Sequence, residues 1–194
     1  IHNKKYLDAN SGLWNACAGF DHPGIIETAR DQYKKFAGYH SLFGRLSEKT
    51  LQLADKIIQV SPFKTGKVFF TNSGAESIEC GLKVIRSYFY QHNIKKDTVI
   101  TFEGAFHGRT FAALSAQQNK NFSRGFEPLL PGFIQVPFND YKAIKNSIDE
   151  NTGGVMIEPI QGEGGVRPAN LQFLEQVRKL CDEMGILFFL DEVQ

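Results

Sequence analysis

Hydrophobic and polar positions in the last two thirds of the chain follow two alternating patterns. Short apolar runs predict buried strands at residues 67–71, 98–102, 154–158 and 186–190. Between these runs, apolar residues return every three or four positions, which predicts helices with one buried face. The predicted helices lie at residues 78–89, 110–118 and 171–184, the last ending at Gly185. Strands that alternate with helices predict an α/β fold, with a mostly parallel sheet and helices on both faces.

The first sixty residues follow a different pattern. Residues 6–20 are rich in small and aromatic side chains, which predicts loops and short strands, and helices are predicted at residues 24–36 and 47–59. No repeat and no Pro/Gly/Ser-rich linker follows them. We therefore expect residues 1–60 to be an N-terminal segment that packs on a large domain, of which residues 61–194 are the first part.

Charge and hydropathy exclude two classes of partner. The chain carries 22 Lys and Arg against 21 Asp and Glu, a net charge of +1, and no basic cluster interleaved with aromatic residues. The longest apolar run has five residues, at 186–190, whereas a membrane helix needs about 20. We therefore expect no nucleic-acid partner and no membrane association.

Cysteine and histidine spacing adds two further expectations. The three cysteines, Cys17, Cys80 and Cys181, form no CxxC pair, which is typical of reduced thiols in a cytoplasmic protein. The histidines show no metal-ligand spacing, so we expect no metal site. The N-terminus shows neither an apolar signal segment nor an initiator Met, and we expect a piece of a longer chain.

Polar clusters follow each predicted strand, and ligands of an open parallel sheet bind at the carboxyl ends of its strands. The clusters begin at Asn72, Glu103, Glu158 and Asp191. The turn at residues 72–76 precedes a helix, where free N–H groups and the helix dipole favour a phosphate. Ser73 and Glu76 also have the spacing of a capping box, and the two interpretations are compatible.

Asp191 at a strand end fits two kinds of phosphorylated ligand, a nucleotide and a pyridine cofactor. A Walker-type NTPase would need a GxxxxGK[ST] loop after a strand. Residues 61–68 match it poorly, with Ser61 for the first glycine and Val68 for the hydroxyl residue, and they precede their predicted strand. The alternative is a phosphorylated pyridine ring, whose nitrogen a carboxylate keeps protonated, as in pyridoxal phosphate chemistry.

Four ordered motifs resemble the class III pyridoxal-phosphate-dependent aminotransferases. They are residues 69–76 (FFTNSGAE), 102–110 (FEGAFHGRT), 157–165 (IEPIQGEGG) and 190–194 (LDEVQ). Residues 66–194 most resemble the acetylornithine aminotransferases of this class, and residues 11–23 resemble its ω-amine transaminases. The resemblance implies the fold-type I architecture and the cofactor pyridoxal 5'-phosphate.

The resemblance also implies site residues. Gly74 and Ala75, with Ser73 adjoining, would bind the cofactor phosphate, and Asp191 would bind the pyridine nitrogen. Glu192, beside Asp191, would also belong to the cofactor site. Phe106 and Val193 would cover the two ring faces, and Gln194 would reach the phenolic oxygen. Arg109 would bind the carboxylate of an acylated donor, and Glu163 would decide which end of the substrate faces the cofactor. Glu158 would support the site.

The implied reaction moves the ω-amino group of an acetylornithine-like donor to a 2-oxo acid, 2-oxoglutarate, in a cytoplasmic homodimer of arginine biosynthesis. The Schiff-base lysine would follow Gln194, so we expect the 194 residues alone to be inactive. Two alternatives stay open. One is a truncated, non-catalytic remnant, and the other is a related transaminase for 4-aminobutyrate or ornithine.

Overall fold

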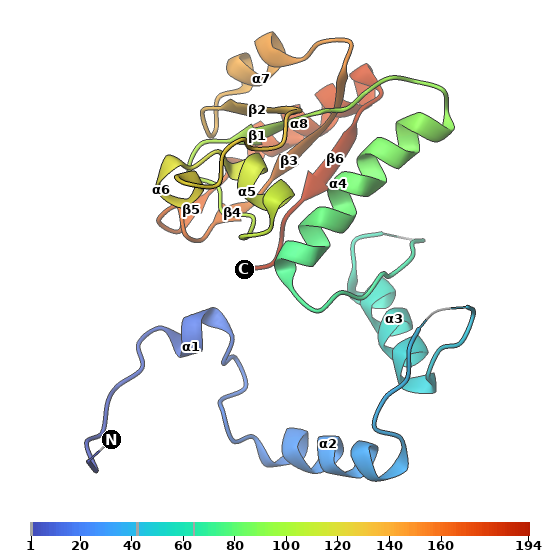
Figure 1. Cartoon of the computed structure of the whole chain (residues 1–194), viewed down its shortest axis with the longest axis vertical. Helices are drawn as coiled ribbons and strands as arrows, with labels where there is room; N and C mark the ends of the chain where they lie inside the picture. Colours follow the sequence, from blue (N-terminus) through green and yellow to red (C-terminus); the bar gives the residue numbers. More distant parts are fainter. Residues whose placement is uncertain (1, 42, 64) are drawn as a thin grey trace. The chain divides into compact units, whose positions relative to one another are not determined.

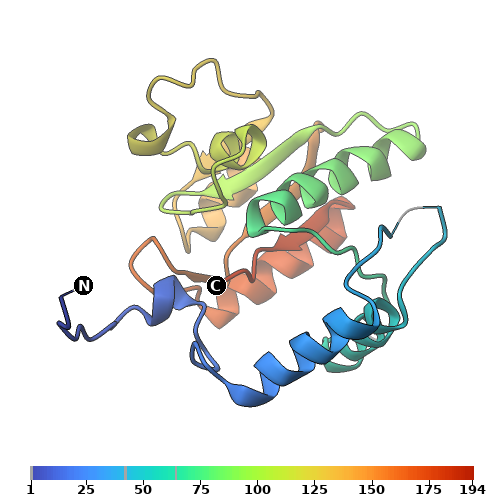
Figure 2. The same ribbon diagram turned by 60° about the horizontal axis from the view of Figure 1, so that its bottom comes forward.

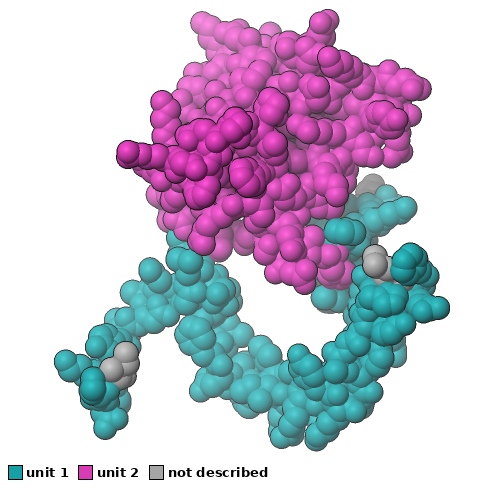
Figure 3. All heavy atoms as spheres, viewed as in Figure 1, with its two compact units in different colours: residues 1–69 teal, residues 70–194 magenta. Residues whose placement is uncertain are grey.

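The computed structural model describes residues 2–41, 43–63 and 65–194. The chain divides into two compact units, residues 1–69 and residues 70–194, coloured separately in Figure 3. The packing of residues 1–60 on the large domain stays a prediction. No helix among the described residues is long and apolar enough to cross a membrane.

The regular secondary structure described in the first unit is helical. Its helices are α1 (Ser11–Trp14), α2 (Pro23–Lys35) and α3 (Glu48–Val60). The α2 helix begins with proline at its first position, and the Ser47 side chain caps α3 by accepting the N–H of Thr50. Both predicted helices are thus confirmed. The short strands predicted within residues 6–20 are wrong, because the structure has only α1 and loops there.

The second unit is built on a four-stranded sheet in the order β2-β1-β3-β6, with every neighbouring pair parallel (Figure 1). Its strands are β1 (Thr98–Phe102), β2 (Phe133–Val136), β3 (Thr152–Ile157) and β6 (Leu187–Leu190). A separate antiparallel hairpin joins β4 (Ile160–Gln161) to β5 (Arg167–Pro168). Phe102 pairs with Val136, and Ile157 with Leu190. The register therefore brings the carboxyl ends of the four strands to one edge.

Helices cover both faces of this sheet (Figures 1 and 2). The helices packed on one face are α4 (Gly74–Gln91) and α5 (Phe111–Gln117), and those on the other are α7 (Tyr141–Ser147) and α8 (Leu171–Met184). A short helix, α6 (Lys120–Ser123), follows α5. The buried residues of α4 are those of the predicted stripe, Ile78, Leu82, Ile85 and Phe89. Helices on both faces of a parallel sheet confirm the predicted fold class.

One predicted strand of the second unit's region is wrong, and one strand and one helix that pack into its sheet layers, β2 and α7, were not predicted. Residues 67–71 form no strand; Phe69 is 75% exposed and Phe70 41% exposed. An apolar run becomes a strand only beside a hydrogen-bonding neighbour, and the described chain supplies none to this segment. Strand β2 and helix α7 went unpredicted because both are short, four residues in β2 and seven in α7, and polar residues interrupt their apolar positions.

Candidate active site

The carboxyl ends of β1, β3 and β6 and the first turn of α4 line one cavity. Predicted site residues in its wall are Gly74, Ala75, Phe106, Asp191, Val193 and Gln194. His107, Glu158 and Ile160 complete the wall. The rule that ligands bind where parallel strands end therefore collects residues that lie up to 120 positions apart, from Gly74 to Gln194.

The first turn of α4 presents backbone donors to this cavity. The Ser73 hydroxyl accepts the N–H of Glu76 at 3.3 Å, and the Glu76 carboxylate accepts the N–H of Asn72 at 2.6 Å. The predicted cap at Ser73 is thus present. The amides of Gly74 and Ala75 belong to the first turn, where no intrahelical acceptor exists. They and the helix dipole favour an anion at this point.

A close contact explains the glycine at the start of α4. A Cβ on Gly74 would lie 2.8 Å from Cγ1 of Val193 and 3.1 Å from its Cγ2. Carbon atoms in van der Waals contact lie about 3.5–4.0 Å apart, so a larger residue would displace Val193. The α4 turn and the segment after β6 therefore pack closely where position 74 lacks a side chain.

Asp191 is buried and paired with a histidine. Its Oδ2 lies 2.7 Å from Nδ1 of His107, whereas its Oδ1 accepts the N–H of Val193 at 3.2 Å. Because a carboxylate only accepts hydrogen bonds, Nδ1 of His107 carries a hydrogen and donates this hydrogen bond to Asp191. The other ring nitrogen, Nε2, is buried without a hydrogen-bond partner among the described residues. The pair is 84 residues apart in sequence, and the strand-end position of His107 was its only signal in the sequence.

Glu158 holds the turn that carries Phe106. Its Oε2 accepts the N–H of Phe106 at 3.0 Å, and the residue is 7% exposed. Burial raises the pKa of Glu158 above its usual value, and the nearby Asp191 charge adds to the rise, while the Phe106 N–H and His107 oppose it. The predicted supporting position of Glu158 agrees with this contact.

Arg109 lies outside this cavity, at the edge of a second one. The second cavity measures about 230 Å³ and has an apolar wall of Phe111, Leu114, Phe122 and Phe126. The Phe122 ring meets the Phe106 ring edge to face, with centroids 5.9 Å apart. The cavity of Arg109 thus adjoins the cavity of Asp191 through two aromatic rings.

The remaining predicted residues are exposed. Ser73 and Glu192 line neither cavity, and Glu163 stands in the loop between β4 and β5. Among the described residues, no group of three His, Cys, Asp or Glu could hold a metal ion.

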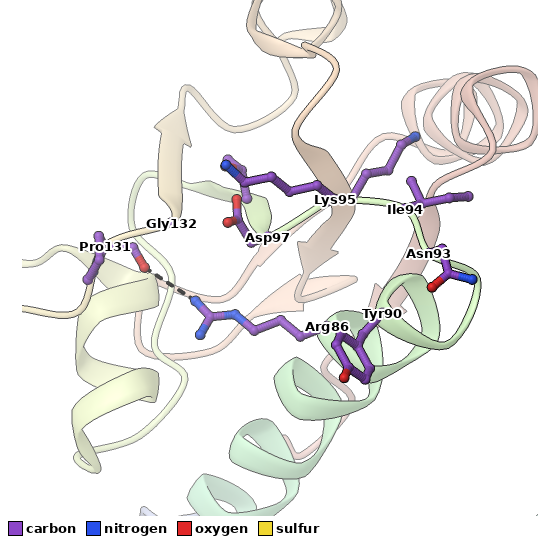
Figure 4. A pocket seen from close by; sticks show the side chains of 10 residues that line it. Arg86, Tyr90, Asn93, Ile94, Lys95, Asp97, Pro131 and Gly132 are labelled. Carbon is purple, nitrogen blue, oxygen red and sulfur yellow. Dashed lines mark hydrogen bonds between the residues drawn. The ribbon is translucent and has the colours of Figure 1, made fainter.

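A hollow larger than either of these cavities lies at the opposite end of the sheet. It measures about 790 Å³ and lies beside the last turns of α4 and the amino end of β1 (Figure 4). Two of its cations are engaged in structural contacts: Arg86 donates to the Pro131 carbonyl at 3.4 Å, and Lys96 to the Met184 carbonyl at 3.2 Å. None of the predicted site residues lines this hollow. Choosing the candidate site by cavity volume would therefore select the wrong place.

Comparison with known proteins identifies the family. The sequence model of the family described as "Aminotransferase class-III" matches residues 1–194. The chain belongs to the class-III aminotransferases. Its similar relatives include the acetylornithine aminotransferase of Rhodobacter capsulatus, 41% identical over 98% of this chain and 48% of the relative. Acetylornithine aminotransferase 1 of Bradyrhizobium diazoefficiens is 42% identical over 98% of this chain and 46% of the relative.

Solved structures agree with this assignment. An ω-aminotransferase from Paracoccus denitrificans matches with a TM-score of 0.90 at 33% identity, covering 97% of this chain and 47% of that one. The PMP-bound aminotransferase of Vibrio fluvialis matches with a TM-score of 0.91 at 32% identity, covering 97% of this chain and 46% of that one. The class-III chain described here thus spans about half the length of the curated relatives it matches.

The wall of the Asp191 cavity fits pyridoxal 5'-phosphate, the cofactor of class-III aminotransferases. Free amides at the start of α4 suit its phosphate, and a buried carboxylate, Asp191, suits a protonated pyridine nitrogen. Phe106 and Val193 offer apolar surface for a flat ring. Residues of the right chemistry for phosphate, ring and nitrogen therefore share one wall.

Proposed function

We propose that the full-length protein is a pyridoxal-phosphate-dependent aminotransferase that moves the ω-amino group of an acylated donor such as N-acetylornithine to 2-oxoglutarate. One observation carries the proposal: the buried Asp191–His107 pair, with its 2.7 Å contact, shares a cavity wall with the amides of Gly74 and Ala75. The proposal extends to a cytoplasmic homodimer acting in arginine biosynthesis.

The proposal assigns a task to five residues of the wall. When bound, the cofactor supplies a protonated ring that stabilises negative charge at the carbon bearing the amine. Asp191 holds the proton on the pyridine nitrogen, and His107 fixes the Asp191 carboxylate by its hydrogen bond. Phe106 and Val193 would hold the ring and exclude water from it, and Gln194 would bind its phenolic oxygen.

Arg109 supports an acylated donor. Its guanidinium forms no ion pair or hydrogen bond with the described residues and stands at the edge of the apolar cavity formed with Phe111, Leu114, Phe122 and Phe126. A cation beside an apolar surface suits a molecule with both a carboxylate and an uncharged acyl group. An unacylated donor such as ornithine would place a second ammonium group near the Arg109 cation, which disfavours it.

The first experiment is the half-reaction of the purified full-length protein, followed by the absorbance of the bound cofactor. N-acetylornithine alone should convert the cofactor to its aminated form, and 2-oxoglutarate should restore it. Ornithine and 4-aminobutyrate should react more slowly. A spectrum that no amine changes would contradict the proposal and favour a non-catalytic protein, whereas preference for 4-aminobutyrate would contradict only the donor.

Arg109→Ala tests the donor assignment separately. The variant should raise KM for N-acetylornithine and leave KM for 2-oxoglutarate nearly unchanged, because only the acylated donor is assigned to Arg109. Arg178→Ala is a matched control, since Arg178 lies on α8 and pairs with Asp182. An unchanged KM for N-acetylornithine in Arg109→Ala would refute the assignment.

A further inference from the structure

The β4–β5 hairpin is attached to the turn after β1 by a buried amide. Gln161 is fully buried, at 0% exposure. Its Oε1 accepts two hydrogen bonds from Arg167, from Nη2 at 2.6 Å and from Nε at 3.2 Å. Its Nε2 donates to the Glu103 carbonyl at 3.0 Å, and Arg167 Nη2 donates to the same carbonyl at 3.3 Å. Arg167 and Gln161 thus tie the two ends of the hairpin loop to the turn that leads into Phe106.

The loop between these anchors lies directly on that turn. A Cβ on Gly164 would lie 2.6 Å from the Gly104 carbonyl oxygen and 2.9 Å from Oε1 of Gln161. Contacts this short leave no room for a side chain at position 164. The loop carrying Glu163 therefore cannot shift toward the turn, and Arg167 limits its movement away from it.

Backbone strain beside Arg167 points to the same restraint. Val166 has a φ of +53°, in the left-handed region that β-branched residues rarely adopt. Such a conformation persists only where the surrounding structure holds it. The residue that follows Val166 is Arg167, whose guanidinium makes the three hydrogen bonds described above and also stacks on Phe138, 5.4 Å from the ring centroid.

Glu163 itself supplies no anchor. Its side chain is exposed and forms no hydrogen bond or ion pair with the described residues. The loop backbone alone therefore places Glu163. On the other side of the turn, the Glu158 carboxylate holds the N–H of Phe106 at 3.0 Å, so the turn is held at both ends by the chain that follows β3.

We infer that Arg167 is a positioning residue, which fixes Glu163 relative to Phe106 through Gln161 and the Glu103 carbonyl. The inference rests on the proposed function in one respect: Glu163, which the family resemblance implies decides which end of the substrate faces the cofactor, would discriminate between N-acetylornithine, which reacts at its ω-amine, and glutamate, which reacts at its α-amine. Loss of the Arg167 guanidinium leaves the buried Oε1 of Gln161 without its donors and releases the strained loop. Discrimination by Glu163 then weakens, although Glu163 is still present.

The structural part is tested on the full-length apoenzyme by hydrogen–deuterium exchange. Arg167→Ala should speed exchange in both residues 103–106 and residues 162–166. Arg178→Ala is the control, since it removes an exposed arginine that also makes two hydrogen bonds to one side chain, that of Asp182. Unchanged exchange in either segment of Arg167→Ala would overturn the inference.

The functional part is a double-mutant cycle on the holoenzyme. The ratio of kcat/KM for N-acetylornithine to kcat/KM for glutamate should fall about tenfold in Arg167→Ala, because Glu163 is then no longer held where it favours the ω-amine. Combining it with Glu163→Gln should lower the ratio little further, because both changes remove one effect. Arg167→Lys should restore only part of the ratio, since lysine cannot donate in the fork geometry of arginine.

The outcomes separate this inference from the proposed function. An equal fall for both substrates, or costs that add in the double variant, would mean a merely structural role and would overturn the inference. If the wild-type holoenzyme transaminates neither amine, the proposed function fails, and the exchange measurement on the apoenzyme still decides whether Arg167 couples the two segments.

Discussion

Gly74→Ala sets two opposing energies against each other at the start of α4. Alanine favours a helix interior over glycine by about 1 kcal/mol, which is an upper bound for Gly74, the first residue of α4. The new Cβ would stand 2.8 Å from Cγ1 of Val193, and overpacking of this kind costs about 1–3 kcal/mol in a core. Val193 is 54% exposed and can move outward, which lowers that cost. We therefore expect the unfolding free energy to change by less than about 1 kcal/mol.

Cofactor affinity should change more than stability does. We assign to a Val193 displaced from the cavity wall the loss of about half of the contact that it would make with the ring. Full burial of a valine is worth about 1.5–3 kcal/mol, so we expect a loss of roughly 1 kcal/mol, about fivefold in the dissociation constant of pyridoxal 5'-phosphate. Val193→Ala removes both Cγ atoms that meet the new Cβ, and in that background Gly74→Ala should cost almost nothing further.

The assay is titration of the full-length apoenzyme with pyridoxal 5'-phosphate, with urea denaturation of the same apoenzyme as the stability measurement. Two results would refute the reasoning. One is wild-type cofactor affinity in Gly74→Ala, and the other is an equal loss of affinity in the wild-type and Val193→Ala backgrounds. Either would mean that the contact between Gly74 and Val193 does not shape the cofactor site.

Three further predictions concern buried groups. His107→Phe removes the donor to buried Asp191 and should lower the unfolding free energy of the apoenzyme by about 1–3 kcal/mol in urea denaturation; an unchanged midpoint would contradict the pairing. Because the pKa of Glu158 is raised in the folded protein, the native state binds the proton more tightly than the unfolded state, so this group lowers stability as pH rises from below the ordinary value of 4.5 through the raised one. Glu158→Gln should remove that part of the slope in thermal melts across this range, and an unaltered slope would refute the assignment. Burial raises the pKa of Cys181 to about 11, so its thiol should resist a thiol reagent at pH 8 until the protein unfolds, and rapid labelling of Cys181 in the native state would contradict its burial.

Elements that depend on local pattern could be predicted from the sequence. The α4 stripe is an example, since Ile78, Leu82, Ile85 and Phe89 are the residues that the helix buries. The cap of α8 is another, because Gly185 adopts the left-handed conformation that ends the helix. Elements that form only beside a neighbouring segment were harder to predict from the sequence. The run at 67–71 has strand composition and no strand beside it among the described residues, whereas β2 is a strand of four residues that only its pairing with β1 identifies.

The site residues divide in the same way, into features that a local pattern predicts and features that depend on contacts between distant segments. That strand ends collect polar residues could be predicted, and Phe106 and Asp191 do share a cavity wall. The partner of Asp191 could not be predicted, because no periodicity links His107 to a carboxylate 84 residues away. Neither could the anchoring of the Glu163 loop, which depends on the Gln161 amide reaching the carbonyl of Glu103 across 58 positions. Contacts between distant segments depend on the packed fold, and single-sequence patterns do not contain them.

The central claim is that this chain forms part of a pyridoxal-phosphate site, and the most direct test is the intact mass of the full-length protein after borohydride reduction. We predict one reduced pyridoxal phosphate fixed covalently per subunit of wild-type protein. Asp191→Asn should keep this adduct, because the mass reports the bound cofactor and not its reactivity. Full-length wild-type protein that gains no mass after incubation with pyridoxal 5'-phosphate and reduction would contradict the account.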